Sequence, residues 1–194
     1  MKPADPSFFF PAPVLQKFCT QCGGQLTRLV LEGDHAPRDV CLHCGAVHYR
    51  NPLVVVGAIP VYRNKILLCQ RAIEPRYGTW TFPSGFMELN ESSAEGAARE
   101  TLEEAGATVQ IGNLHCVINI PDISQIHIYY LAHCSSDYLD PGPESLAAGF
   151  YDLAEIPWEN LAFRSIRTAL EHYVNDLNLE KPQPHIYELR KKDF

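Results

Sequence analysis

The sequence GFMELNESSAEGAARETLEEAG, residues 85–106, contains six glutamates and almost nothing bulky in its second half. Ser92, followed three residues later by Glu95, has the pattern of a capping box, in which two side chains satisfy backbone N–H groups at a helix start. Gly106 suits a helix end, because glycine adopts the left-handed conformation of a C-cap at little cost. The stretch therefore predicts a helix from about residue 93 to about residue 105.

Three of the glutamates fall on one face of this helix. With a rotation of ~100° per residue, Glu104 lies about 40° and Glu103 about 60° from Glu100 around the axis. The other members of this face are small residues, Gly96 and Ala97. The opposite face is expected to pack on a sheet and consists of Ala94, Ala98, Thr101, Leu102 and Ala105.

Two interpretations of the acidic face are open, a solvated surface helix and a divalent-metal site. Glu100 and Glu104 are like charges at i,i+4, a spacing at which a solvated helix gains from opposite charges. A divalent cation would reverse this repulsion, and carboxylate oxygens select Mg²⁺ or Mn²⁺. Gly96 costs the helix up to ~1 kcal/mol relative to alanine, and the approach of a ligand is one reason to keep it. The pattern favours a metal site that binds a diphosphate.

The spacing of the polar residues resembles the Nudix box: Gly85, Glu91, Arg99, Glu100, Glu103, Glu104 and Gly106. Thr101 and Ala107 occupy the two aliphatic positions of that pattern. The resemblance implies an α+β fold, the Nudix α/β/α sandwich with a mixed sheet. It also implies hydrolysis of a nucleoside diphosphate linked to another group.

The resemblance assigns metal ligands as well. The three glutamates of the acidic face, Glu100, Glu103 and Glu104, would hold Mg²⁺ or Mn²⁺ together with the backbone carbonyl of Ser84. A further carboxylate is expected from a later loop. Glu144 is the candidate for it, and Asp137 and Asp140 are the alternatives.

Three other residues of the box receive supporting roles from the resemblance. Arg99 would orient a helix carboxylate through charge-assisted hydrogen bonds. Glu91 would brace the loop or a water near the metal. Gly85 would keep the loop backbone close to the metal.

Four of the seven cysteines form two C-x-x-C pairs, each followed by glycine: Cys19, Cys22, Cys41 and Cys44. One such pair is compatible with a redox motif, but two predict a Cys₄ zinc site. A closed Cys₄ site has no open coordination position, so this zinc would be structural. The intervening residues 25–32 alternate like a strand, and His43 and His48 are not counted as ligands.

The remaining segments predict strands at residues 53–62, 65–72, 79–83, 107–120 and 124–134, and a helix at residues 164–177. Residues 137–145 read as a loop, and residues 178–194 as an extended tail. The domain prediction is an N-terminal extension at 1–16 and a zinc ribbon at 17–50. A Nudix hydrolase domain at 51–178 and a C-terminal tail at 179–194 complete it.

A Cys₄ ribbon ahead of a Nudix domain resembles the NADH pyrophosphatases, but their SQPWPFPxS signature is missing here. The segments NPLVVVG, EEAGATV and PGPESL are similar instead to a plant plastid Nudix hydrolase that acts on FAD and ADP-ribose. This implies Mg²⁺-dependent cleavage of FAD or ADP-ribose to AMP plus a monophosphate, by a homodimer. The alternatives are an NADH pyrophosphatase or NAD-cap hydrolase, and a non-catalytic zinc-ribbon binding module.

Candidate substrate contacts lie upstream of the box. Arg71 and Arg76 could meet a phosphate, and Tyr77 could stack on a base. The alternatives are surface arginines without a ligand and a tyrosine that packs on the core. Phe163 and Arg164 could close the site at the start of the last helix.

Composition limits the partners. The net charge of −7 argues against nucleic acid as a general partner, because such proteins usually carry a basic patch. The apolar run at residues 52–62 is interrupted by Gly57 and Pro60 and is shorter than the ~20 residues of a membrane helix. No signal peptide is visible, and the odd cysteine count indicates reduced thiols. We therefore expect a cytoplasmic protein.

Overall fold

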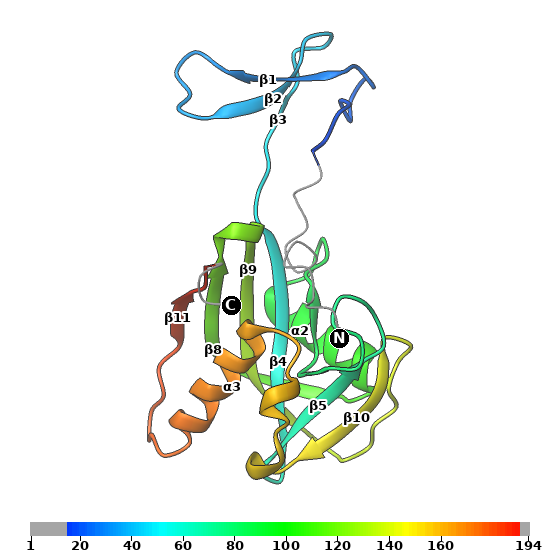
Figure 1. Cartoon of the computed structure of the whole chain (residues 1–194), viewed down its shortest axis with the longest axis vertical. Helices are drawn as coiled ribbons and strands as arrows, with labels where there is room; N and C mark the ends of the chain where they lie inside the picture. Colours follow the sequence, from blue (N-terminus) through cyan, green and yellow to red (C-terminus); the bar gives the residue numbers. More distant parts are fainter. Residues whose placement is uncertain (1–14, 191–194) are drawn as a thin grey trace. The chain divides into compact units, whose positions relative to one another are not determined.

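The computed structural model of the protein describes residues 15–190. The chain divides between Pro52 and Leu53 into two compact units. Figure 1 labels the helices and strands of both units. The first unit holds the two C-x-x-C pairs, and the second holds the acidic helix. Among residues 15–190, no helix is long and apolar enough to cross a membrane.

The first unit is a three-stranded antiparallel sheet of β1 (Leu26–Val30), β2 (Pro37–Cys41) and β3 (Val47–His48). Asp34 organises the turn between β1 and β2, because its carboxylate accepts the backbone N–H groups of His35 and Ala36 and pairs with Arg38 at 2.6 Å. The strand expected within residues 25–32 is confirmed as β1.

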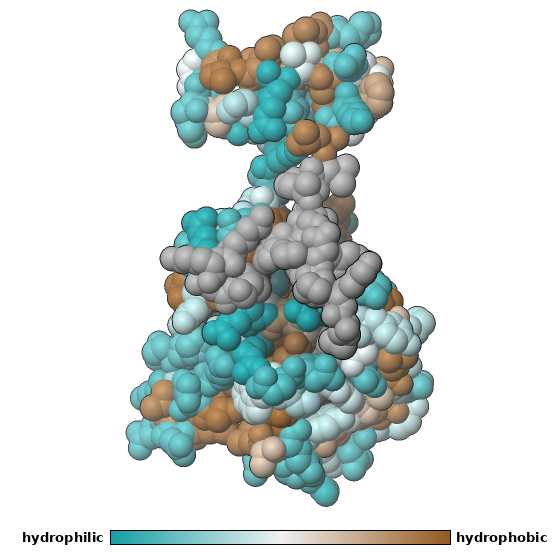
Figure 2. Space-filling view, in the orientation of Figure 1, coloured by the Kyte–Doolittle hydropathy of each residue, from teal (hydrophilic) through white to brown (hydrophobic). Residues whose placement is uncertain are grey.

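This ribbon has almost no apolar core. From residue 15 to residue 52 the buried residues are Cys19, Asp39, Val40 and Cys41. Large apolar side chains such as Phe18 and Leu42 remain exposed, and Figure 2 shows apolar residues beside hydrophilic ones on the ribbon surface. A unit below ~40 residues usually needs a metal or disulfides to fold. A metal held by the two cysteine pairs would supply the stability that a core otherwise provides.

The second unit is built on one mixed sheet. Its strands are β4 (Leu53–Tyr62), β5 (Lys65–Arg71), β6 (Trp80–Thr81), β7 (Ser84–Phe86), β8 (Val109–Ile120), β9 (Gln125–Cys134), β10 (Ser145–Tyr151) and β11 (His185–Glu188). The strand order is β10-β5-β4-β9-β8-β11, with β6 paired to β5 and β7 paired to β4. The pairs β4–β9 and β8–β11 are parallel, and the other pairs are antiparallel. The predicted mixed sheet is confirmed.

Within residues 15–190, two α-helices accompany this sheet, α2 (Ser93–Ala105) and α3 (Arg164–Asp176). Three 3₁₀ turns occupy the connections: η1 (Pro121–Ile123), η2 (Leu153–Glu155) and η3 (Trp158–Asn160). The capping box of α2 is present in both directions, and Gly106 ends the helix with φ 65°. The predicted bounds of this helix are confirmed because its signals are local.

The sheet is covered on both faces. Along β5, Ile66 and Leu68 pack with α3, whereas Leu67 and Cys69 pack with the end of α2. Figure 1 shows α3 in front of the sheet and α2 behind it. A strand that is buried on both faces reads as a continuous apolar run, which is why β4 and β5 lack polar alternation. The α/β/α sandwich follows from this pattern.

The prediction for the packed face of α2 is wrong in part. Thr101 and Ala105 are buried as expected, but Leu102 is 54% exposed and Ala98 is only half-buried. The buried side of the helix carries Glu100 and Glu104 instead. The small residues of the acidic face let this face approach β4 and β7, so the carboxylates turn toward the protein.

Several strands were not predicted, among them β3 and β7, and two of the others lie late in the chain. Residues 145–151 form β10, which pairs with β5, although the sequence SLAAGFY has neither alternation nor β-branched residues. Residues 185–188 of the expected tail form β11, which pairs with β8 beyond the predicted domain end at residue 178. Leu189, next to β11, is 3% exposed and belongs to the core. Pairing partners far away in the sequence decide both strands.

Candidate active site

The backbone at residues 84–85 is pressed against α2. β7 pairs with β4, and Gly57 of β4 leaves room for Pro83 and Ser84, which a side chain there would strike. A Cβ added at Gly85 would overlap the carboxylate of Glu100. Glycine at both positions therefore permits a close approach of this loop to α2, and places the Ser84 backbone beside the acidic face of the helix.

Glu100 and Glu104 form a buried carboxylate pair, one helical turn apart and 9% and 7% exposed. Burial, followed by the charge of Glu100, raises the pKa of Glu104 to about 8. Burial also raises the pKa of Glu100, against a hydrogen bond from Arg99. The Ser84 N–H donates to Glu104 Oε2 at 3.3 Å. Ionising both carboxyl groups costs free energy, because the two negative charges repel each other in a buried site. A bound cation would offset this repulsion.

Arg99 ties the acidic face together. Its Nε and Nη2 donate to the two oxygens of Glu91 at 3.0 and 2.9 Å. Its Nη1 donates to Glu100 Oε1 at 2.8 Å and to Glu103 Oε2 at 2.9 Å. Nη2 also donates to the Phe86 carbonyl at 3.0 Å. One oxygen each of Glu100 and Glu103 is therefore held by Arg99, which leaves the other oxygen of each carboxylate for a ligand.

Glu91 braces the loop that precedes α2. Hydrogen bonds from Arg99 and from the Glu88 N–H lower its pKa to about 2. A Cβ added at Gly96 would meet Glu91 Oε1 at 2.5 Å and Val56 Cγ2 at 2.8 Å. The reason for glycine at position 96 is thus this packing, and the expected approach of a ligand there is not what the structure shows.

The other candidate carboxylates occupy different positions. Glu103 is at the open side of the cluster, with a side chain that is 60% exposed. The charge of Glu144 contributes to the raised pKa values of Glu100 and Glu104, so it lies within electrostatic reach of both. Asp140 lies instead at the end of α2, where its N–H donates to the Ala105 carbonyl. Asp137 is exposed.

Arg71, at the end of β5, lies within electrostatic reach of the same cluster. Its charge lowers the pKa of Glu104, and burial lowers its own pKa. Its Nε donates to the Pro75 carbonyl at 3.1 Å, and its Cζ lies 5.1 Å from the centre of the Phe163 ring. The contact with Pro75 was not predicted, because no local signal announces it.

Arg76 and Tyr77 follow Arg71 in the turn between β5 and β6. Both residues are exposed, and the exposed fraction of Tyr77 is 58%. The Arg76 carbonyl accepts the Thr79 hydroxyl, which closes the turn. Arg71 thus lies within electrostatic reach of Glu104, whereas Arg76 and Tyr77 lie on an exposed turn.

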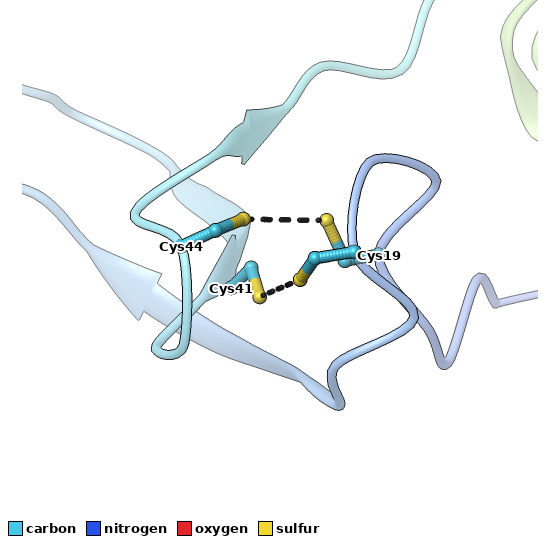
Figure 3. A group of neighbouring side chains, drawn as sticks. Cys19, Cys41 and Cys44 are labelled. Carbon is cyan, nitrogen blue, oxygen red and sulfur yellow. Dashed lines mark hydrogen bonds between the residues drawn. The ribbon is translucent and has the colours of Figure 1, made fainter.

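The four predicted zinc ligands come together in the first unit, and their sulfur atoms lie within 4.8 Å of one another. Figure 3 shows Cys19, on the loop before β1, facing Cys41 and Cys44, which lie at the end of β2 and beyond it. The pair Cys19–Cys44 is separated by 3.7 Å and the pair Cys22–Cys41 by 3.5 Å. Sulfur atoms bound at ~2.3 Å to one tetrahedral ion lie about 3.8 Å apart. The cluster therefore fits zinc.

The environment of the Cys19 thiol favours the metal-binding thiolate, whereas the neighbouring cysteines hold the pKa of Cys22 at about 12. Burial raises the pKa of Cys19, but backbone hydrogen bonds from Gln21 and Cys22 and a contact with His48 lower it to about 6. His48 Nε2 lies 3.3 Å from Cys19 Sγ. His48 thus supports a ligand from outside the Cys₄ set.

Family models match both units of the chain. A zinc-ribbon family described as "Nudix N-terminal" matches residues 17–50, and the family described as "NUDIX domain" matches residues 51–170. The ribbon and the sheet with the acidic helix are thus matched separately.

Two curated relatives differ in length. An ADP-ribose pyrophosphatase of Methanocaldococcus jannaschii is 30% identical over 156 residues, which cover 77% of this chain and 91% of the relative. A NAD-capped RNA hydrolase NudC of Vibrio atlanticus is 30% identical over 168 residues, which cover 83% of this chain and 58% of the relative. The match to NudC thus spans little more than half of that protein.

Solved structures agree with the fold. A Nudix hydrolase from Nitrosomonas europaea is 45% identical, with a TM-score of 0.88, and the match covers 91% of this chain and 100% of that one. An ADP-ribose pyrophosphatase from Streptococcus suis has a TM-score of 0.58 at 22% identity, over 70% of this chain and 99% of that one, which shows the fold alone.

Proposed function

The chain belongs to the Nudix hydrolase family, and we propose that it is a Mg²⁺-dependent pyrophosphohydrolase that cleaves the diphosphate of ADP-ribose or FAD. The products would be AMP and the remaining monophosphate. The observation that carries this proposal is the buried pair of Glu100 and Glu104. A pair of carboxylates held in this way is destabilising without a cation and becomes favourable with one.

The metal ligands of the proposal are Glu100, Glu103, Glu104, Glu144 and the Ser84 carbonyl. A bound Mg²⁺ or Mn²⁺ would neutralise the diphosphate and lower the pKa of a water nucleophile. Arg99 supports this assignment, because it occupies only one oxygen each of Glu100 and Glu103. Gly85 supports it as well, because it brings the Ser84 backbone next to the helix carboxylates.

Protons accompany the cation. Because the pKa of Glu104 is about 8 without a metal, its carboxyl carries a proton at neutral pH. That proton must leave when a cation binds, so cation binding releases protons at neutral pH and strengthens as pH rises toward 8. Arg99 is held by five hydrogen bonds to three carboxylates and a carbonyl, so the remaining cluster keeps its geometry while Glu104 ionises.

The three proposed substrate contacts would meet different parts of the substrate. Arg71 lies within electrostatic reach of Glu104 and would receive the diphosphate. Arg76 and Tyr77 lie on the exposed turn that follows and would contact the part of the substrate beyond it. The ADP-ribose assignment draws support from the M. jannaschii relative, which matches over nearly its whole length. The FAD assignment rests on the plastid-like segments of the sequence.

A second candidate is an NADH pyrophosphatase or NAD-cap hydrolase. The NudC relative, whose match spans most of this chain, favours it. A panel of ADP-ribose, FAD, NADH and NAD⁺, assayed for AMP release with and without Mg²⁺, separates the two candidates. Preference for ADP-ribose or FAD supports the proposal, preference for NADH supports the second candidate, and AMP release without any divalent ion overturns both.

The Glu103→Gln variant separates catalysis from a binding role. Glu103 is exposed, so this variant should fold normally and lose most of its turnover. A non-catalytic module would keep its function in this variant. We further propose a structural zinc in the ribbon, a cytoplasmic location and a homodimer. One zinc per chain by elemental analysis, localisation by fractionation and a dimer in sedimentation would support these three points in turn.

A further inference from the structure

Arg71 and Arg99 use their guanidinium groups in opposite ways. The N–H groups of Arg99 donate hydrogen bonds to three carboxylates and a carbonyl. Arg71 lies near enough to lower the pKa of Glu104, but among residues 15–190 it forms no ion pair with a carboxylate. Its one side-chain hydrogen bond to the described residues runs from Nε to the Pro75 carbonyl. The two Nη groups of Arg71 are thus the donors that remain for a ligand.

Backbone pairing fixes the stem of Arg71. Its N–H donates to the Thr79 carbonyl at 2.9 Å, and its carbonyl accepts the Gly78 N–H at 2.8 Å. The next residue, Ala72, donates its N–H to the Glu144 carbonyl at 2.8 Å. These backbone hydrogen bonds therefore hold Arg71 in a fixed position. They also connect its strand to the loop that contains the candidate ligand Glu144.

Pairing with β6 also brings Phe163 close to Arg71. Trp80 of β6 forms a parallel bridge with Leu161, and its carbonyl accepts the Ala162 N–H at 2.8 Å. Phe163 follows at the N-cap of α3 and packs against the core of the unit. Its ring then lies 5.1 Å from Arg71 Cζ. Two segments far apart in the sequence meet because β6 pairs with both.

We infer that Phe163 is a positioning residue for Arg71: its ring and the Pro75 carbonyl orient the guanidinium so that the Nη donors face the diphosphate. This inference rests on the proposed function. The aromatic face supports a planar cation without using its N–H groups, whereas an ion pair would use them. Two parallel N–H donors match a phosphate, so the orientation of the fork sets the affinity for the substrate.

The test compares Phe163→Leu with Phe163→Tyr, which restores the ring, each in the wild-type and Arg71→Ala backgrounds. In the wild-type background, Phe163→Leu should raise KM for ADP-ribose about three- to tenfold, the effect of one cation–π contact, with kcat little changed. Phe163→Tyr should return KM to near the wild-type value. In the Arg71→Ala background, Phe163→Leu should change nothing further. An equal effect in both backgrounds, or no rescue by tyrosine, overturns the inference.

A matched control is Phe150→Leu. Phe150 lies on β10 beside β5, and its ring packs on Tyr62 at 5.6 Å. This variant should lose stability comparably and leave KM unchanged. If Phe150→Leu raises KM as much as Phe163→Leu, general loosening of the sheet edge explains the effect and the inference fails.

A second readout is independent of turnover. The Nε–H resonance of Arg71 in ¹⁵N-labelled protein should shift when the Phe163 ring is removed, and should shift in the wild type when inorganic pyrophosphate is added with Mg²⁺. If both shifts are seen but no dinucleotide of the panel releases AMP, the inference holds and the proposed substrates are wrong. No response of Arg71 to pyrophosphate would overturn the inference even if the panel shows activity.

Discussion

Replacing Glu104 by glutamine should stabilise the Mg²⁺-free protein at alkaline pH. The folded protein holds a proton on Glu104 up to a pKa of about 8, whereas the unfolded chain releases it near 4.5. Between these values the folded state binds more protons than the unfolded state. Wild-type stability therefore falls as pH rises from 4.5 through 8, and the variant escapes this loss.

The magnitude follows from the same two values. The gap between 4.5 and about 8, at ~1.4 kcal/mol for each pKa unit, corresponds to about 5 kcal/mol. Relaxation of the site around a buried charge lowers this figure, so we expect the variant to be about 2 to 5 kcal/mol more stable above pH 8. The advantage should vanish below the unfolded pKa, where the wild-type carboxyl is protonated in both states.

Urea unfolding followed by tryptophan fluorescence measures this difference. The two tryptophans of the sequence, Trp80 and Trp158, both lie in the second unit, so the signal reports on that unit and is not complicated by the ribbon. Adding Mg²⁺ should stabilise the wild type and leave Glu104→Gln almost unaffected. Glu103→Gln is the control: its carboxylate is exposed, so its Mg²⁺-free pH profile should follow the wild type. A Glu104→Gln variant with the wild-type pH profile would refute the reasoning.

Three further substitutions test the site and the ribbon. Gly85→Ala should lower Mg²⁺ affinity and turnover at least about tenfold, because the new Cβ would overlap the Glu100 carboxylate; an unchanged Mg²⁺ titration contradicts the close approach. Arg99→Lys should weaken Mg²⁺ binding, because an ammonium cannot span the carboxylates as the guanidinium fork does; full activity in the lysine variant would contradict that role. Cys41→Ser should lose the zinc and unfold the ribbon while tryptophan-detected unfolding of the second unit stays the same; retained zinc, by elemental analysis, would argue against the Cys₄ set.

Local chemistry made much of this protein predictable from its sequence. The start and end of α2 follow from Ser92, Glu95 and Gly106, whose hydrogen bonds reach only a few residues along the chain. The Cys₄ cluster follows from two C-x-x-C pairs, because each pair forms half of a tetrahedral site by itself. The strands β4 and β5 follow from apolar runs that only a sheet covered on both faces can bury.

Only the tertiary structure decided which face of α2 is buried, because that depends on the approach of β4 and β7 and not on helical periodicity. It alone placed β10 and β11, whose short sequences become strands through pairing with β5 and β8. It also brought Phe163 to Arg71, through a strand that pairs with both neighbouring segments. The residues that form a helix cap or a C-x-x-C pair are close together in the sequence, so they can be recognised there. The partners of an edge strand or of a buried charge come from distant parts of the chain, so only the folded structure identifies them.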